Sequence, residues 1–262
     1  MNIPFHAQFG EDRALHKLFG GKTDGLCVEV GANDGLNGSN TLFFERLGWD
    51  CILVEPNPEL CALMRGFRTA RLFEVAASDR EGTATLQIAV GAAGAHAVST
   101  MDPGAGMRTL RAHGFSSRPV DVPTRRLDAI LADATGGKAI DFITIDVEGH
   151  EMAALSGLSL DVWKPRVIII ESNNSVSGRT VSQHLRDADY VRFRRTGVND
   201  WYARTTDTEL GTVVRRALYY PSRALAQSKI AALAFKLRVR KLPGVLPVWN
   251  LGKRLLGGTR NA

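Results

Sequence analysis

Short apolar runs alternate with stretches of helical periodicity over the first two hundred residues. Strands are predicted over Leu26–Val30, Cys51–Glu55, Leu72–Ala76, Ile140–Asp146 and Val167–Glu171. Helices are predicted over Gly38–Leu47, Pro58–Gly66, Leu127–Ala134, His150–Ser156 and Val181–Ala188. Such alternation favours right-handed crossovers and a mostly parallel sheet with helices on both faces, which is an α/β fold. In such sheets ligands bind beyond the carboxyl ends of the strands.

Three further segments complete the body. Tyr190–Arg194 and Asp200–Arg204 are predicted to form a hairpin, and Thr83–Val90 and Pro119–Thr124 alternate like exposed strands. The intervening Gly91–Ser117 is rich in Gly, Ala and Ser, which predicts a long loop that could serve as a lid.

The tail has a different pattern, so we divide the chain into a body, residues 1–206, and a tail, residues 207–262. Helical patterns over Thr208–Tyr220 and Ser222–Leu242 are separated by Pro221, and a short basic segment, Trp249–Leu256, follows. An apolar stripe of helical spacing runs through Ala226, Ile230, Leu233 and Leu237. The tail is therefore predicted to be an amphipathic helical extension.

Charge separates the same two parts. Thr205 to Ala262 contain eleven Lys or Arg and two acids, so the body keeps 22 of the 33 bases and 25 of the 27 acids. We expect residues 208–256 to contact an anionic membrane surface. The alternative is that the stripe packs on the body or on a second subunit, giving a homo-oligomer. The acidic body argues against a nucleic acid partner.

Composition fits a folded protein with a sizeable core, since 44% of the 262 residues are hydrophobic and 23% are charged. No uncharged apolar run reaches the ~18 residues that a membrane span requires. The first twelve residues do not resemble a secretory signal. Three scattered cysteines are typical of core thiols in a reducing compartment. We expect a cytoplasmic protein, with the tail peripheral at the inner face of the membrane.

A glycine turn after the first strand predicts a nucleotide-like ligand. The sequence from Glu29 reads EVGANDG, in which Gly31 and Gly35 permit close backbone approach. Asn33 interrupts the dinucleotide fingerprint, and the carboxylate of Glu29 suits a cationic ligand better than a pyrophosphate. Glu55, at the end of the second strand, can accept both hydroxyls of a ribose. Adenosine with positive charge indicates S-adenosylmethionine as cofactor; the alternative is a tight turn with no ligand.

Two more clusters follow strands. Ser78 and Asp79 could hydrogen-bond an adenine edge, or simply cap a turn. Asp146, Glu148 and His150 crowd the turn after the fourth predicted strand, and we select them as catalytic candidates. His150 titrates near neutrality and could act as the base, in competition with a metal held by Asp146 that would lower the pKa of the hydroxyl.

A metal site is predicted from the ends of the fourth and fifth strands. Asp146 and Glu171 should face each other there, with Asn173 nearby. An oxygen-only set of ligands suits Mg²⁺ or Ca²⁺. The alternative is hydrogen bonding without a metal.

Several short segments, in order and at sensible spacings between Phe5 and Arg204, resemble the FkbM-type methyltransferases. They are Gln8–Asp12, Glu29–Gly35, Ser39–Thr41, Gly48–Trp49, Val54–Pro56, Ala77–Arg80, Leu127–Asp128 and Ile145–Glu151. Asp146 and Glu171 are also similar in position to the Mg²⁺ ligands of catechol-type O-methyltransferases. In those enzymes Asn follows the second acid directly, whereas Ser172 intervenes here.

The resemblance implies a Rossmann-like class I methyltransferase fold with a seven-stranded sheet. It also implies methyl transfer from S-adenosylmethionine to a sugar hydroxyl of a glycolipid, polysaccharide or glycosylated natural product. Two other hypotheses stay open: an NAD-dependent oxidoreductase, and a membrane- or glycolipid-binding protein on an inactive scaffold. A nucleic-acid methyltransferase is disfavoured, because the signature for methylation of base amines is absent.

Overall fold

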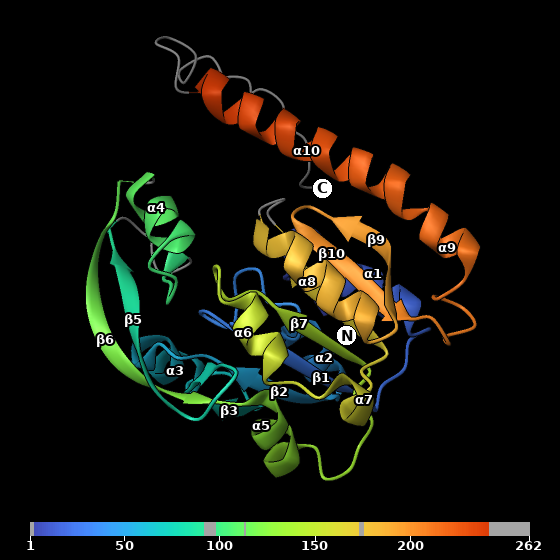
Figure 1. The fold of residues 1–262 in the computed structure, drawn as a ribbon, viewed down its shortest axis with the longest axis horizontal. Helices are drawn as coiled ribbons and strands as arrows, with labels where there is room; N and C mark the ends of the chain where they lie inside the picture. The colour runs from blue at the N-terminus through green and yellow to red at the C-terminus, as the bar shows by residue number, and fades with distance from the viewer. Residues whose placement is uncertain (1–2, 92–97, 113, 173–175, 241–262) are drawn as a thin grey trace, which may run out of the picture.

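The computed structural model of the chain describes residues 3–91, 98–112, 114–172 and 176–240, and consists of a central sheet, a β-arm and a long C-terminal helix (Figure 1). The sheet has seven strands in the order β3-β2-β1-β7-β8-β10-β9. Their bounds are β3 Arg71–Phe73, β2 Asp50–Val54, β1 Leu26–Val30, β7 Phe142–Ile145, β8 Val167–Glu171, β10 Asn199–Arg204 and β9 Tyr190–Thr196. β10 runs in the direction opposite to that of the other six strands. This confirms the predicted α/β fold and its terminal hairpin.

Helices cover both faces of the sheet. On one face lie α5 (Leu127–Ala134), α6 (Glu151–Ser156), α7 (Leu160–Trp163) and α8 (Val176–Asp187). On the other lie α1 (Glu11–Leu18), α2 (Leu42–Leu47) and α3 (Pro58–Met64). The central strands β1 and β8 are apolar along almost their whole length because both of their faces are covered.

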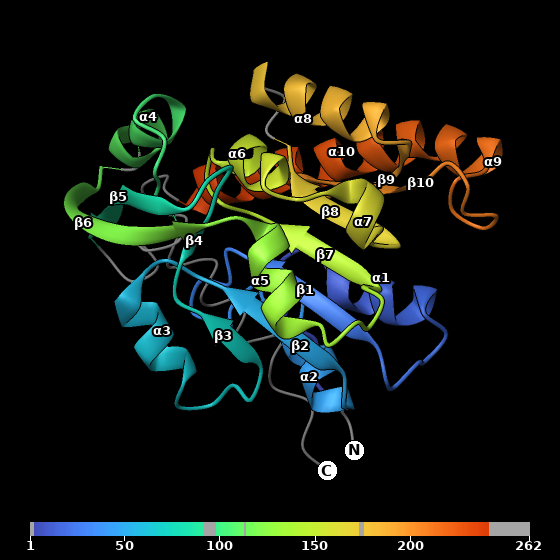
Figure 2. The same ribbon diagram turned by 60° about the horizontal axis from the view of Figure 1, so that its bottom comes forward.

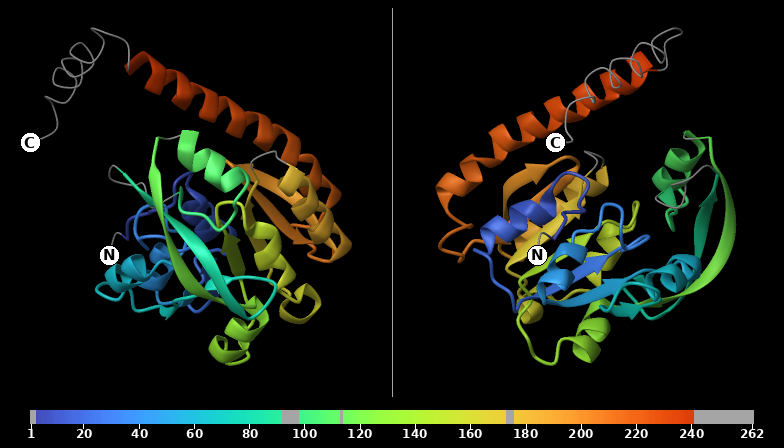
Figure 3. Two further views of the ribbon diagram at one scale, coloured as in Figure 1. Left: turned by 60° about the vertical axis from the view of Figure 1, so that its left-hand side comes forward. Right: turned by 180° about the vertical axis from the view of Figure 1, so that it is seen from behind.

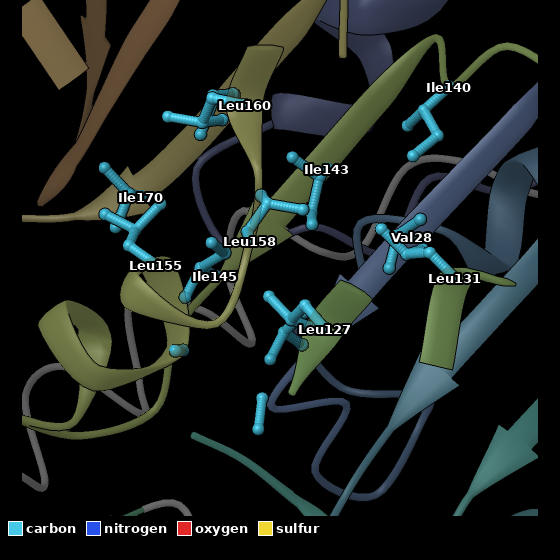
Figure 4. Packing of buried hydrophobic residues seen from close by; sticks show 14 of the residues in the cluster. Val28, Leu127, Leu131, Ile140, Ile143, Ile145, Leu155, Leu158, Leu160 and Ile170 are labelled. Atoms are coloured by element: carbon cyan, nitrogen blue, oxygen red, sulfur yellow. The ribbon is translucent and has the colours of Figure 1, made fainter. Parts of the chain in front are cut away.

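The largest core cluster lies between the sheet and the first group of helices. Figure 4 shows Val28 of β1, Ile143 and Ile145 of β7 and Ile170 of β8 among leucines from α5, α6 and the chain after α6. The side chains of Val28, Ile143 and Ile170 are fully buried. Alternate residues of the strands point into the cluster on the opposite face. The packing on both faces fixes the strand ends that form the site.

The β-arm departs from two predictions. β3 ends at Phe73 and β4 (Ala76–Ala77) joins a second sheet of order β4-β6-β5, so the strand predicted over Leu72–Ala76 is split. β5 (Gly82–Val90) and β6 (Ser116–Arg125) are antiparallel and curve away from the body (Figure 2). The predicted loop between them contains α4 (Ala105–Ala112) in its described part.

The tail begins with α9 (Val213–Ala217) and α10 (Tyr219–Arg240), so the predicted break at Pro221 is wrong. Pro221 lies in the first turn of α10, where its missing N–H leaves no hydrogen bond unmade. Tyr219 and Ala226 are buried against the body. Figure 3 shows α10 running along the edge of the body and extending toward the side on which α4 lies. The segment Trp249–Leu256 lies outside the described residues.

Among the described helices, none combines the length and apolar character needed to cross a bilayer. The three cysteines are buried free thiols.

Candidate active site

A cavity of about 580 Å³ lies at the carboxyl ends of β1, β2, β7 and β8. The ends of these strands bring together the glycine turn, Glu55, Asp146, Glu148 and Glu171. Residues of the N-terminal segment and of the β-arm complete the wall: Gln8, Phe9, Leu86, Val98, Ser99 and Met101. A cavity of this size is typical of small-molecule and cofactor sites.

Gly31 is fixed by its contact with the end of β7. It has a φ of +83°, and a Cβ at this position would lie 1.8 Å from the carbonyl oxygen of Asp146. The Gly31 N–H donates to Val54 O at 2.9 Å. The turn can therefore follow this path only with glycine, and a ligand can approach its backbone closely.

The carboxylate of Glu29 organises the entry to α2. It accepts hydrogen bonds from the Ser39 and Thr41 hydroxyls and from the Asn40 N–H, the first at 2.8 Å and the last at 2.6 Å. These bonds hold Ser39–Thr41 as a turn, so α2 begins at Leu42 and is shorter than the predicted helix over Gly38–Leu47. Glu29 lines the cavity, but its hydrogen bonds here go to the chain itself.

Glu55 closes the glycine turn from the β2 side. Its carboxylate accepts the N–H of Asn33 at 2.8 Å and the N–H of Asn57 at 2.9 Å. Asn33 has a φ of +53°, which directs its N–H toward this carboxylate. Burial raises the pKa of Glu55 to about 7, and the two backbone hydrogen bonds oppose the rise. Gly35, with a φ of +70°, packs against the side chain of Met64.

Ser78, Asp79 and His150 form a separate group. The Ser78 hydroxyl lies 3.2 Å from Asp79 Oδ1 and 3.2 Å from His150 Nε2. Burial lowers the pKa of His150, with Asp79 and Asp102 acting in the opposite direction. Among the described residues that line the cavity, none of these three appears. The structure thus places both the adenine candidates and the candidate base His150 outside the cavity wall.

Asp146, Glu148 and Glu171 form an acidic floor in the cavity. The side chain of Asp146 is accessible to solvent in the cavity. Its pKa is nevertheless raised well above the usual range, first by desolvation within the surrounding protein and second by the negative charges of Glu171 and Glu148. The pKa of Glu148 rises to about 8 through burial, Glu171 and Glu151. Because the carboxylates repel one another, the acidic floor remains partly protonated at pH values where isolated carboxyl groups are ionised.

The donor set for the predicted Mg²⁺ is incomplete in the described chain. Asp146 and Glu171 both line the cavity, whereas Asn173 lies outside the described residues. Across residues 3–91, 98–112, 114–172 and 176–240, no group of three or more His, Cys, Asp or Glu is close enough to hold a metal ion. The prediction of Mg²⁺ is not supported by these residues, and we derive no step through it.

The β-arm is tied to the acidic floor. Glu148 has a φ of +51°, and its carbonyl oxygen accepts the Thr100 hydroxyl at 2.7 Å. Gly149, with a φ of +102°, leaves room for Asp102, whose Oδ2 would lie 3.1 Å from an added Cβ. The conformation of the loop after β7 therefore depends on the arm, which in turn brings Ser99 and Met101 to the cavity.

Two cavity residues, Thr144 and Asn40, were not among the predicted site residues, although Asn40 lies in the family motif Ser39–Thr41. Thr144 Oγ1 and Asn40 Oδ1 are buried, and neither has a hydrogen-bond partner within the described chain. Both residues line the cavity. Buried polar atoms are normally satisfied, so these two atoms are available to a ligand. A signal for Thr144 was present in the sequence, since it is the polar member of the strand FITI.

The sheet order, the glycine turn and the acid after β2 in one cavity define a class I, Rossmann-like methyltransferase that uses S-adenosylmethionine. Residues 29–192 match the methyltransferase FkbM domain. The chain belongs to this family, as its sequence motifs predict. No curated protein matches the chain.

Solved methyltransferase structures resemble the chain at low identity. M. capricolum TrmK in complex with S-adenosylhomocysteine is 11% identical, with 95% of each chain covered and a TM-score of 0.40. The O-methyltransferase from Bacillus cereus in complex with the same product is 14% identical, covers 77% of this chain and 82% of its own, and has a TM-score of 0.34. Precorrin-6y C5,15-methyltransferase from Geobacter metallireducens is 14% identical, with 73% and 84% covered and a TM-score of 0.35. These similarities say nothing about the acceptor.

Proposed function

We propose that the chain transfers the methyl group of S-adenosylmethionine to a hydroxyl oxygen of a carbohydrate, as part of a glycolipid, a polysaccharide or a glycosylated natural product. One observation carries the proposal. The glycine turn and the carboxylates of Asp146, Glu148 and Glu171 line the same cavity. Carboxylates accept hydrogen bonds from hydroxyl groups and can take their protons, so the cavity offers both cofactor and acceptor chemistry.

The cofactor end is assigned to the turn around Gly31 and to Glu55. The Glu55 carboxylate, already positioned by Asn33, would accept the ribose hydroxyls. The unsatisfied oxygens of Thr144 and Asn40 suit the ammonium and hydroxyl donors of the ligand. S-adenosylmethionine, when bound, supplies an electrophilic methyl group on a positively charged sulfur.

Asp146 is assigned as the base. The carboxylate of Asp146 would accept the hydroxyl proton as the acceptor oxygen bonds to the methyl carbon, and the carbon–sulfur bond would break to leave a neutral thioether. A raised pKa makes this carboxylate a stronger base than an ordinary aspartate, and Glu148 and Glu171 help to maintain the rise. Orientation of the acceptor against the methyl group supplies the rest of the acceleration.

The alternatives for activation are His150 and Mg²⁺. His150 lies against Ser78, outside the cavity wall, and the described residues supply two of the three predicted metal ligands. Chelation separates the schemes. Activity that survives exhaustive chelation supports Asp146 as an unaided base, and loss that added Mg²⁺ restores supports a site at Asp146, Glu171 and Asn173.

Identification of the methylated atom tests the proposal. The protein is incubated with S-adenosylmethionine carrying a carbon-13 methyl group and with panels of neutral and phosphorylated sugars. Carbon NMR of the product then reports the atom that bears the label. Methyl on a sugar oxygen supports the proposal, and methyl on nitrogen or carbon of the accepted substrate contradicts it.

We also propose that α9 and the start of α10 dock on an anionic membrane. The exposed apolar side chains are Val213, Val214, Leu218, Tyr220 and Leu225, with 48% to 77% of each accessible. Arg215, Arg216 and Lys229 are exposed around them, and the chain from Leu210 to Arg240 contains no acidic residue. A second copy docked through the same face would bring these positive charges together, whereas anionic lipid complements them.

A further inference from the structure

A second cavity, of about 550 Å³, lies between α8, β9 and the start of α10. Its charged lining is made of arginines from all three elements: Arg179 and Arg186 from α8, Arg192 from β9 and Arg223 from α10. Within the described chain, no acidic side chain lines it. We refer to it as the arginine cavity.

Arg192 is held in place at the base of the arginine cavity. Its guanidinium donates to the Ser182 hydroxyl at 2.7 Å and to the Tyr219 hydroxyl at 3.0 Å. The guanidinium also lies 5.1 Å from the centre of the Tyr219 ring. Asp200 is 3.4 Å away, but its other oxygen pairs with Arg195 at 2.7 Å. The single carboxylate of Asp200 is thus shared by the guanidinium groups of Arg192 and Arg195.

The remaining lining suits an anion. Arg179 and Arg186 are exposed on α8, seven positions apart and therefore on one face of the helix. Ser182 lies between them along the same face, and its hydroxyl oxygen is 3.4 Å from a guanidinium nitrogen of Arg186. Guanidinium groups form paired hydrogen bonds with phosphate oxygens. Four of them around one hollow are the chemistry that recognises a phosphate or pyrophosphate group.

The arginine cavity adjoins the catalytic one. Glu171, at the end of β8, lines the catalytic cavity, and the next residue, Ser172, lines the arginine cavity. The Ser172 N–H donates to the carbonyl of Val198, which also lines the catalytic cavity, at 3.0 Å. The Ser172 carbonyl accepts a hydrogen bond from Arg195 at 2.8 Å. Adjacent residues at the end of β8 therefore line the two cavities.

We propose that the arginine cavity binds a phosphate or pyrophosphate group of the methyl acceptor, so that the acceptor is a phosphorylated sugar whose hydroxyl reaches the floor at Asp146. The inference rests on the proposed function for its account of the acceptor. The anion can belong to a soluble sugar phosphate or to a lipid-linked one, since both present the same group.

Direct binding of sodium pyrophosphate, measured by titration calorimetry, tests the arginine cavity without any methyl transfer. The wild-type protein should bind it, and Arg179→Gln/Arg186→Gln should bind at least about tenfold more weakly. Arg13→Gln/Lys17→Gln, which removes the same charge from exposed positions of α1, should match the wild type. Equal affinity in the two double variants, or no binding by the wild type, would overturn the proposal.

Competition identifies the source of the anion. Glucose 1-phosphate that displaces pyrophosphate supports a soluble acceptor. Displacement only by neutral vesicles that carry a polyprenyl phosphate supports a lipid-linked one. Displacement by neither overturns the assignment to an acceptor phosphate.

The result is separable from the proposed function. If pyrophosphate binding depends on Arg179 and Arg186 but no sugar is methylated, the arginine cavity stands and the proposed activity fails. If phosphorylated sugars are methylated, Arg179→Gln/Arg186→Gln should raise their KM at least about tenfold while affinity for S-adenosylhomocysteine, bound in the other cavity, is unchanged. An unchanged KM would contradict the role of the arginine cavity and leave the methyltransferase assignment intact.

Discussion

The alpha carbon of Gly31 faces the carbonyl oxygen of Asp146 so closely that a methyl group on Gly31 would lie 1.8 Å from it. This contact joins the turn assigned to the cofactor to the acid assigned as base. Gly31 and Asp146 lie in one cavity because β1 and β7 are neighbouring parallel strands that end at the same edge of the sheet. The distance between the Gly31 turn and Asp146 is thus set by the backbone of the sheet.

Gly31→Ala should therefore destabilise the protein by at least about 3 kcal/mol, because the added carbon overlaps backbone that cannot move without breaking the sheet. Gly21→Ala is the matched control, since Gly21 has a similar φ of +80° and nothing within 4 Å of an added Cβ. Its cost should be about 1 kcal/mol, from the left-handed backbone alone. Urea unfolding measures both. Equal losses would show that the contact with Asp146 is not rigid.

Affinity for S-adenosylhomocysteine should rise with pH and level off above about 7. The pKa of Glu55 is raised to about 7, and ribose hydroxyls bind the ionised carboxylate better than the protonated one. The gain between about pH 6 and about pH 8 should be close to tenfold. Glu55→Gln should bind weakly with no such slope. Calorimetry over this pH range checks both proteins, and a parallel slope in the variant would assign the titration to another group.

Glu148 should set the pH dependence of the reaction. In the wild type, kcat/KM should climb with pH toward about 8, where Glu148 ionises. Glu148→Gln removes a negative neighbour, which lowers the pKa of Asp146. The rising limb should then move to lower pH by roughly one unit. If kcat/KM of Glu148→Gln rises over the same pH range as that of the wild type, Glu148 does not affect the pKa of the base.

The apolar face of α9 and α10 should bind anionic vesicles. Leu218→Ser/Leu225→Ser in the full chain should reduce co-sedimentation with phosphatidylglycerol vesicles by about tenfold or more, because it removes two exposed leucines from the face. Leu63→Ser/Val162→Ser removes similar exposed side chains from the body and should leave binding unchanged. Wild-type binding should weaken with salt. If the wild type is instead a dimer that does not bind vesicles, and Leu218→Ser/Leu225→Ser is a monomer, the apolar face is a contact between subunits.

Much of this site could be predicted from the sequence because parallel strands share one carboxyl edge. Glu29–Asn33, Glu55, Asp146 and Glu171 lie at the ends of strands that apolar runs reveal, and all of them line the cavity, whereas the predicted cofactor residue Gly35 is not part of its wall. Thr144 was overlooked because it lies inside a strand, where a single polar residue carries little weight against an apolar pattern.

Contacts between distant segments could not be predicted. The start of α2 at Leu42 depends on hydrogen bonds from Ser39 and Thr41 to Glu29, which no local periodicity records. The direction of His150 depends on Ser78, far away in the chain. The arginine cavity likewise is lined by residues of α8 and α10, which are distant in the sequence and come together only when the chain folds.

The central claim is that Asp146 takes the proton of an acceptor held beside the cofactor. Its most direct test is kcat for Asp146→Asn, measured beside the affinity of the same variant for S-adenosylhomocysteine. We predict a loss of at least about a hundredfold in kcat with affinity for the product kept within a few fold, because the amide keeps the shape of the carboxylate but cannot take the proton. A variant that retains the wild-type kcat would contradict the account.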